Sequence, residues 1–398
     1  MTTDETQSSG TEEEKTQLFQ FIKWIIKVLY SPVKTFEEIV KKPNIKGPIL
    51  ILLITLPIIV GGQFVFGAKF FSVTPEPEKD LWTEQSAGTP SFIWTSNDNV
   101  VFDGEDYIVG NNSVSASMTN SSSIWMRLTN IGRFDCSEGE YDQLFFRIIW
   151  VNEANVTPAA TVRLFSMYNE SRRFELDLGK TIANRTGTWA NVSVNLDTDE
   201  WIMTPENLPD WENITGVGFE LTWDNPSNIT MKIDDLLFGK YIPLSSFDTF
   251  NLQLLYSLMR SSVDFLLQWV ILSGIVLLAL KSFSNWNGTW RTLLSIVGYV
   301  YSVSIVYFGL LTILFLLLPP LFFPYNITYS EYVDIYQTNW GIPISALSLL
   351  SYVWTIVLCT IALRKIHELS LNKAFLIGFG AFIMSLLLSS FLLGLLSL

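Results

Sequence analysis

Residues 47–67 read GPILILLITLPIIVGGQFVFG, and this apolar run decides the class of the protein. A bilayer core about 30 Å thick requires roughly 20 apolar residues of helix, so the run predicts a membrane span. Pro57 and the Gly61–Gly62 pair lie within it, and membrane helices tolerate both. Further apolar runs follow at about 265–280, 291–318, 344–363 and 374–396. None of the five runs has a Lys, Arg, Asp or Glu in its middle, so we expect an α-helical transmembrane bundle of five spans.

Lysine and arginine near the ends of the runs set the expected orientation, because basic loops favour the cytoplasmic side of a membrane. Seven lysines precede the first run, and the loops after the second and fourth runs are also basic. The loop at 319–343 contains no Lys or Arg. With five spans, all basic segments share one side, so we expect a cytoplasmic N-terminus and a C-terminus on the opposite side. That opposite side is the cell exterior, or the lumen if the membrane is internal.

The segment before the first run is expected to contain a tail and two helices. Residues 1–15 are acidic and polar, which is typical of a disordered cytoplasmic tail. Residues 18–30 have a wide apolar face and a narrow, mostly basic stripe. Such a helix suits the membrane interface, and packing against the spans explains the pattern equally well. A second helix is expected to begin at Pro32 or at Thr35 and to end at Pro43.

The stretch 82–245 lies between the first two spans and has a different composition. Period-two alternation of apolar residues predicts strands in it, of which the clearest are FFRIIWV, ATVRLFSMY, WANVSVNL, GVGFELTW and ITMKIDDLLF. Turns rich in Asn, Gly, Ser and Asp separate them. We therefore expect an inserted, extracytoplasmic all-β sandwich, which about 160 residues can build around one core. Its 23 Asp and Glu against 10 Lys and Arg carry the whole net charge of −13, which argues against a nucleic-acid partner.

The glycosylation signals of the insert agree with an extracytoplasmic location. Eight of its 16 asparagines begin an Asn-x-Ser/Thr sequence, the acceptor pattern for N-linked glycans. These eight are Asn111, Asn120, Asn155, Asn169, Asn184, Asn191, Asn213 and Asn228, and Asn326 in the loop 319–343 is a ninth. We therefore expect a glycoprotein.

Few residues in the chain are suited to catalysis. His367 is the only histidine and lies in a predicted cytoplasmic loop. Cys136 lies in the insert and Cys359 in the fourth span, so they cannot pair with each other. Three acidic residues lie close together in an expected loop, namely Glu138, Glu140 and Asp142. They have the residue types of a glycosidase pair, but a solvated loop explains them better, and we expect no enzyme activity.

Three motifs resemble those of the Yip family of membrane proteins, which interact with Ypt/Rab GTPases. SPVKTFEEIVKKPNIKGPILILLI resembles the entry to the family's first span, with Pro32, Phe36 and Pro43 at the matching positions. NGTWRTLLSIVGYV resembles its third span, and LRKIHELSLNKAFLIGFGAF resembles the loop into its fifth span. The matching positions in these two motifs are Arg291, Gly298, Tyr299, Lys373 and Ala374.

This resemblance covers residues 16–75, as interfacial helices and first span, and residues 250–398, as the remaining four spans. It implies a cytoplasmic protein partner such as a small GTPase, or a homo-oligomer. Two features depart from the family. A whole domain stands where the family has a short hairpin, and Ser302 and Ser304 stand where a proline often follows the Gly-Tyr pair.

The end of the insert resembles the jelly rolls of carbohydrate-binding modules and galactose-binding domains, because TWANVSVNL precedes DWENITGVGFELTW and ITMKIDDLLFGKY. Such domains often hold a structural calcium, and the resemblance implies Asp234 and Asp235 as ligands. Asp103, Glu105 and Asp106 could join them, while a capped turn at Asp234 explains the pair as well. The candidates for stacking on a sugar are Trp150, Trp189, Trp201, Trp211 and Trp223. Buried tryptophans usually belong to a core, and we expect Trp189 there.

Three functions stay open at this point. The first is a non-enzymatic membrane scaffold whose outer domain recognises a glycan, an envelope layer or a protein. The second is a trafficking or membrane-shaping factor that recruits a cytoplasmic GTPase. The third is a transporter or channel component, which is disfavoured because the spans have almost no ionisable residues to line a pathway. Apart from the calcium, we expect no cofactor.

Overall fold

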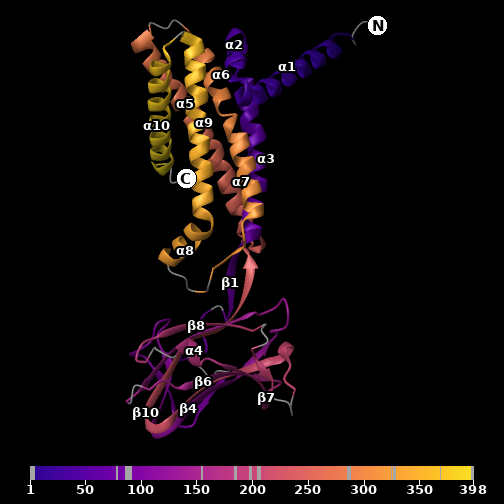
Figure 1. Cartoon of the computed structure of the whole chain (residues 1–398). Helices are drawn as coiled ribbons and strands as arrows, with labels where there is room; N and C mark the ends of the chain where they lie inside the picture. Colours follow the sequence, from indigo (N-terminus) through magenta and orange to yellow (C-terminus); the bar gives the residue numbers. More distant parts are fainter. Residues whose placement is uncertain are drawn as a thin grey trace. The chain divides into compact units, whose positions relative to one another are not determined.

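The computed structural model describes residues 5–77, 79–85, 92–153, 156–182, 186–196, 200–203, 208–284, 288–323, 325, 329–367 and 369–395. The chain divides into two compact units (Figure 1). The helical unit comprises Met1–Phe71, Pro243–Leu321 and Thr328–Leu398. The β unit comprises Ser72–Ile242 and Phe322–Ile327. The division agrees with the composition change that predicts an inserted domain.

The helical unit confirms the five predicted spans. Its helices are α1 (Glu5–Tyr30), α2 (Pro32–Lys41), α3 (Lys46–Lys69), α5 (Phe250–Ser284), α6 (Trp290–Val300), α7 (Val303–Leu317), α8 (Tyr329–Tyr336), α9 (Ile342–His367) and α10 (Leu371–Leu395). In the described part of the chain, five stretches are long and apolar enough to cross a membrane, namely Lys46–Lys69, Phe250–Phe283, Trp290–Leu317, Tyr329–Ile366 and Leu371–Leu395. Within this unit α3 packs against α7, and α5 packs against α10. The chain is therefore an integral, multi-pass membrane protein.

Two spans differ from the sequence prediction. The second span begins at Phe250 rather than at about 265, so α5 contains Arg260 and Asp264. The predicted start at about 265 was therefore too late, and the longer helix carries two charged residues that the apolar run excludes. The apolar run starts just after Asp264, but the helix begins 14 residues earlier, at Phe250, because residues 250–264 contain no Gly or Pro to interrupt it. The third span is broken into α6 and α7 by a turn at Tyr301–Ser302.

The N-terminal helices pack against the rest of the helical unit. One face of α1 is buried, and its Trp24 Nε1–H donates to the Glu38 carboxylate of α2 over 2.9 Å. Another face leaves Phe19 and Ile26 exposed, which keeps the membrane interface available to it. Helix α1 begins at Glu5, within the segment whose composition predicts a disordered tail. Helix α2 begins at Pro32 and ends before Pro43, as one of the two predictions has it.

Glycine permits a close approach between α3 and α6. A Cβ atom on Gly47 would overlap the Tyr299 ring, and one on Gly298 would overlap Pro48. Tyr299 is fully buried, and its ring meets the Trp24 ring edge to face with centroids 6.0 Å apart. The Gly-Tyr pair is therefore a packing feature. Of the other motif residues, Phe36 and Ala374 are buried, Pro32 and Pro43 are half-buried, and Arg291 and Lys373 are exposed.

The β unit is built from antiparallel strands. They are β1 (Phe70–Glu76), β2 (Ile93–Ser96), β3 (Val100–Asp103), β4 (Ser113–Phe134), β5 (Gln143–Asn152), β6 (Ala159–Ser166), β7 (Asn169–Asp177), β8 (Ala190–Asn195), β9 (Ile202–Met203), β10 (Ile214–Pro243) and β11 (Leu321–Phe323), with α4 (Gly179–Ile182) and the 3₁₀ turn η1 (Trp211–Asn213) between them. The strands predicted from alternation are confirmed as β5, β6, β8 and the two halves of β10.

Strands β4 and β10 are paired along their lengths and take part in two layers. The first half of β10 pairs with β6 and with the second half of β4, which also pairs with β2. The second half of β10 pairs with β5 and with the first half of β4, which also pairs with β3. The register shifts between Thr222 and Ser227, where the chain passes from one layer to the other.

The two layers enclose one core, which confirms the sandwich. Phe146 of β5 and Phe219 of β10 meet between the layers with ring centroids 4.9 Å apart. On β4, Ile124 and Met126 are fully buried in the same core as Val114 from the strand's other half. Alternate residues of every long strand therefore face inward, and the residues between them form two outer faces.

Candidate functional site

The outer face of the first layer carries a row of charged side chains. Register places Arg127 of β4 opposite Gly218, Gly218 opposite Arg163 of β6, and Arg163 opposite Glu175 of β7. One row further along, Trp125 lies opposite Glu220. We call the five side chains the charged face, and they are Trp125, Arg127, Arg163, Glu175 and Glu220.

Ion pairs hold the charged face in place. Arg163 bonds Glu175 over 2.8 Å and also pairs with Glu220. The Arg127 guanidinium lies 4.2 Å from the centroid of the Trp125 ring, a cation–π contact. Partial burial raises the pKa of Glu175, but hydrogen bonds from Arg173 and Arg163 outweigh it and leave that pKa below its usual value. The face is therefore organised before any ligand arrives.

The backbone beneath the charged face is flat at β10. Gly218 has no side chain, and a Cβ there would lie 2.9 Å from the Phe165 ring. The Phe165 ring therefore lies over β10 at Gly218, the position that faces both Arg127 and Arg163 in the register. Exposed Ile93 and Ile202 stand on the flanking strands β2 and β9. The sequence analysis predicted no residue of the charged face as a binding residue. The alternation in SSSIWMRL could have shown that Trp125 and Arg127 lie on the side of β4 away from the core.

The tryptophans predicted as sugar platforms lie elsewhere. Trp150, Trp201 and Trp223 belong to the core, and Trp211 packs against it with its ring stacked 3.7 Å from that of Phe174. The prediction that Trp189 is a core residue was wrong. Its indole is half-buried and donates to Asp106 over 2.9 Å, because the inward positions of β8 are 190, 192 and 194.

The predicted calcium ligands are engaged in hydrogen bonds. Asp234 is buried, and its Oδ2 accepts from the backbone N–H groups of Ile108 (2.6 Å) and Val109 (3.1 Å). Its Oδ1 accepts from the Asp235 N–H over 2.8 Å. The Asp235 carboxylate pairs with Arg147 at 3.3 Å. Asp234 thus fastens a loop to the second layer.

The other predicted acidic ligands do not join Asp234. Lys232 Nζ lies 2.7 Å from both Asp103 and Asp106, and its hydrogen bonds lower the pKa of each carboxyl. Glu105 is exposed. Within the described residues, no three His, Cys, Asp or Glu side chains have an arrangement that could hold a metal.

Asp80 is the carboxylate that sequence reasoning missed beside Asp234. It is 6% exposed, and burial raises its pKa to about 8, with the nearby charges of Asp234 and Asp235 acting in the same direction. The Thr83 hydroxyl donates to Asp80 and lies 3.3 Å from Asp234. The Oδ2 atom of Asp80 has no hydrogen-bond partner within the described residues. Nothing in the sequence links positions so far apart.

The remaining catalytic candidates do not converge. Glu140 pairs with Lys240 over 3.1 Å, and Glu138 is exposed on the preceding turn. Cys136 is buried and unpaired in a disulfide, and burial raises the pKa of its thiol well above the usual value. The His367 side chain lies outside the described residues.

The described glycosylation candidates are not residues of the charged face, but Asn169 is next to Glu170, the ion-pair partner of Arg127. Asn111, Asn120, Asn169, Asn191 and Asn228 are exposed, and Asn213 is half-buried. Asn155, Asn184 and Asn326 lie outside the described residues. None of the described ones belongs to the charged face.

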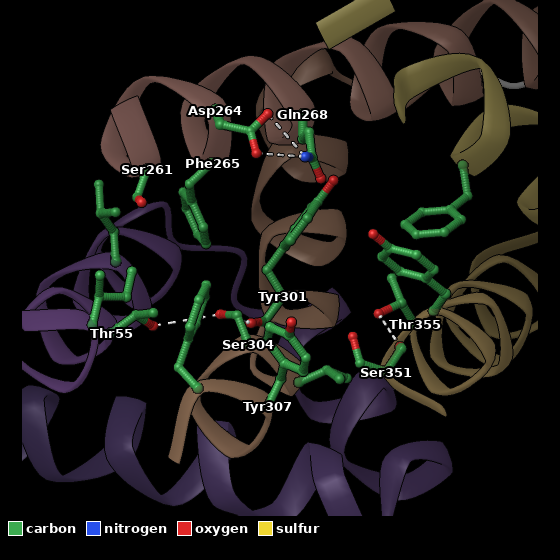
Figure 2. Close-up of a pocket in the computed structure, with 16 residues that line it drawn as sticks. Thr55, Ser261, Asp264, Phe265, Gln268, Tyr301, Ser304, Tyr307, Ser351 and Thr355 are labelled. Carbon is green, nitrogen blue, oxygen red and sulfur yellow. Dashed lines mark hydrogen bonds between the residues drawn. The ribbon is translucent and has the colours of Figure 1, made fainter. Parts of the chain in front are cut away.

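The helical unit contains a polar cavity of about 200 Å³ (Figure 2). Its walls come from α3, α5, α7, α9, α10 and the turn between α6 and α7. Polar lining residues are Thr55, Ser261, Asp264, Gln268, Tyr301, Ser304, Tyr307, Ser351, Tyr352 and Thr355. Both Asp264 oxygens accept from the Gln268 amide nitrogen at 2.9 Å. The cavity therefore places a carboxylate inside the set of spans.

Comparison with known proteins identifies one domain. Residues 230–393 match the family model described as the Yip1 domain. This matched range contains the motif residues Arg291, Gly298, Tyr299, Lys373 and Ala374. Pro32, Phe36 and Pro43 precede the matched range. No curated protein matches the chain.

Several solved structures of carbohydrate-active proteins show a distant likeness. An exo-beta-agarase is 14% identical with a TM-score of 0.29, over 42% of this chain and 25% of its own. A family 11 carbohydrate-binding module from Clostridium thermocellum is 12% identical with a TM-score of 0.27, over 42% of this chain and 94% of its own. A family 30 module is 14% identical with a TM-score of 0.28, over 45% and 92%. The chain thus covers only a quarter of the agarase.

Proposed function

We propose that the chain is a non-enzymatic membrane protein whose β unit binds carbohydrate through the charged face, with the helical unit as its anchor and scaffold. The observation that carries this proposal is the row of Arg127, Arg163 and Glu175 beside Trp125 on an outer sheet face. Guanidinium groups donate hydrogen bonds and carboxylates accept them, so together they match sugar hydroxyls, which do both. An aromatic ring adds an apolar platform.

The charge of the face favours an uncharged ligand. Arg127 and Arg163 balance Glu175 and Glu220, whereas residues 82–245 as a whole carry 13 more negative than positive charges. A neutral patch on an acidic domain does not repel a neutral oligosaccharide and does not attract nucleic acid.

Replacing Trp125 with Ala should weaken glycan binding by about tenfold or more, because 1.4 kcal/mol of lost ring contact is a tenfold change. The measurement is binding of the full-length protein in nanodiscs to a broad glycan array, followed by titration of the best ligand. Trp189→Ala is the matched control, since Trp189 is also half-buried but directly precedes β8, a strand of the second layer.

Equal losses in both variants would show that the ring acts through folding rather than through contact. A wild-type protein that binds no glycan would refute the carbohydrate assignment and leave an envelope layer or a protein as the partner. The GTPase-recruiting role is independent of this face, and would survive either result.

The proposed orientation places the β unit outside the cytoplasm. Cysteines introduced at the exposed positions Ser282 and Ser330 should be labelled by an impermeant maleimide from opposite sides of the membrane. The native Cys136 and Cys359 are buried and should stay unlabelled in the folded protein. Labelling of both introduced cysteines from one side would contradict the five-span arrangement.

A further inference from the structure

We propose that the polar cavity around Asp264 binds one alkali-metal cation, Na⁺ or K⁺. The cavity lies within the helical unit and is independent of the charged face. Asp264 is the only ionisable acid or base among its lining residues apart from tyrosines, so no Lys or Arg neutralises the carboxylate there. An ionisable residue inside a membrane span is costly unless it has a partner, and it usually marks a functional site.

Three hydroxyl groups of the cavity offer oxygen lone pairs rather than hydrogens. Thr55 donates to the Ile51 carbonyl, Ser304 to the Tyr301 carbonyl, and Thr355 to the Ser351 carbonyl, over 2.8, 2.7 and 2.8 Å. Each of these hydroxyls has a backbone acceptor for its single hydrogen, and the oxygens of Thr55 and Ser304 also lie 3.4 Å apart, so what each offers to a ligand is its lone pairs. An acceptor-rich wall suits a cation and disfavours an anion.

Tyr301 supplies a second, independent sign of a ligand. Its side chain is only 7% exposed, and its hydroxyl makes no hydrogen bond of full geometry within the described residues, where Ser385 is the polar side chain near it. The break between α6 and α7 turns this residue into the cavity wall, where Figure 2 shows it among Asp264, Gln268 and Ser304. A buried hydroxyl without a partner costs free energy, and a bound ion or its water would relieve that cost.

Gln268 completes the set of oxygen atoms. Its amide nitrogen is occupied by the Asp264 carboxylate, and therefore its carbonyl oxygen remains as an acceptor. The carboxylate is thereby fixed on α5 rather than free to turn toward the lipid. Asp264, Gln268 and Ser304 then come from two different helices and face a shared space.

Charge and size select a monovalent ion. One carboxylate neutralises one positive charge, whereas sites for divalent ions use several carboxylates. A volume of about 200 Å³ is many times the roughly 10–15 Å³ that one water requires, so the cavity accommodates an alkali ion with part of its hydration shell. Thr55 lies about 13 Å along α3 from Lys46 at 1.5 Å per residue, so the cavity is well inside the span.

The test is cation-dependent stabilisation of the helical unit in the full-length protein in detergent. Cys359 is 1% exposed in that unit, so a thiol-reactive dye reports its unfolding, in a Cys136→Ala background that silences the β unit. Melts are compared in NaCl, KCl and N-methyl-D-glucamine chloride at one ionic strength and one pH. A bound ion stabilises the folded state by mass action, so Na⁺ or K⁺ should raise the unfolding temperature saturably.

Asp264→Asn should abolish the alkali-ion dependence, and Asp248→Asn, an exposed acid outside the cavity, should retain it. If Asp264→Asn does not fold, Tyr301→Phe should shift the dependence to a several-fold higher ion concentration. Equal melting in all three salts, or dependence unchanged in Asp264→Asn, would overturn the proposal. Stabilisation by lowered pH without any alkali-ion effect would also overturn the proposal, because it would show that Asp264 takes up a proton rather than an ion.

Discussion

Raising the pH from about 5 to about 9 should destabilise the β unit by up to about 4 kcal/mol through Asp80, because its pKa of about 8 lies about three units above the starting pH. The pKa of this carboxyl is raised from 3.8 to about 8 by burial and by the charges of Asp234 and Asp235. The folded state therefore holds a proton that the unfolded chain releases at mild pH. The measurement is urea unfolding of the full-length protein in detergent, followed by β-sheet circular dichroism at each pH.

The direction follows from proton binding in the two states. Between pH about 4 and about 8 the folded chain binds one more proton than the unfolded chain, so stability falls as pH rises through this window. Below it Asp80 is protonated in both states, and its contribution is complete. Arg147 faces Asp235 at 3.3 Å and offsets only part of the negative charge.

Asp80→Asn should remove this loss, because the amide keeps the shape and cannot ionise. Asp103→Asn is the contrasting variant. Hydrogen bonding to Lys232 lowers the pKa of Asp103, so its contribution is present above the unfolded pKa and is lost as the pH falls. A wild-type protein whose stability is level from pH about 5 to about 9 would show that Asp80 is not buried as described.

The same experiment tests the predicted calcium. Asp80 and Asp234 with the Thr83 hydroxyl present few oxygens, and calcium requires six or more. We therefore expect the pH slope to be the same in calcium and in chelator. A slope that disappears in calcium and returns with chelator would assign the pair to the ion, because the ion would keep both carboxylates charged.

The parts of the fold that depend on local patterns could be predicted. Apolar length located the five spans, and period-two alternation located β5, β6, β8 and β10. The same logic, applied to Trp189, should have placed it outward, because Ala190 and Val192 fill the inward phase of its strand. That error came from taking the clean alternation of the strand as a sign of burial without asking which phase Trp189 occupies.

The parts that depend on distant residues could not be predicted. Asp80 meets Asp234 only because the chain from 79 to 85 returns to the second layer, where Trp82 enters the core. The charged face assembles from four strands, and register alone brings Arg127 level with Arg163. Long-range pairing of this kind leaves no local periodicity.

Asp264 is a different case, because a local signal existed. Asp264 and Gln268 stand four residues apart, as do the hydrogen-bonded neighbours of a helix face. The span boundary was set by hydropathy alone, which excluded the carboxylate and with it the cavity. The sequence argument against a transporter or an ion-binding site depended on spans with almost no ionisable residues, and Asp264 within α5 weakens that argument.

Replacing Trp201 with Ala should destabilise the β unit by about 3–5 kcal/mol, which is the usual cost of truncating a buried aromatic side chain. Trp201 is 6% exposed, its Nε1–H donates to the Asn195 carbonyl over 2.9 Å, and its ring meets Trp211 edge to face at 5.8 Å. The substitution removes the core volume and leaves the carbonyl without that bond. The check is the same urea unfolding, with Trp189→Ala as the half-buried control.

The alternative for Trp201 was a surface platform for sugar, and the two roles give opposite results. A platform residue would lose ligand affinity and keep its unliganded stability. A core residue loses stability first, and the loss is shared by all strands because the sandwich has one core. Trp201→Phe should recover part of the stability, since the ring again fills space but cannot donate to Asn195. An unliganded Trp201→Ala protein as stable as the wild type would remove Trp201 from the core and return it to the list of ligand contacts.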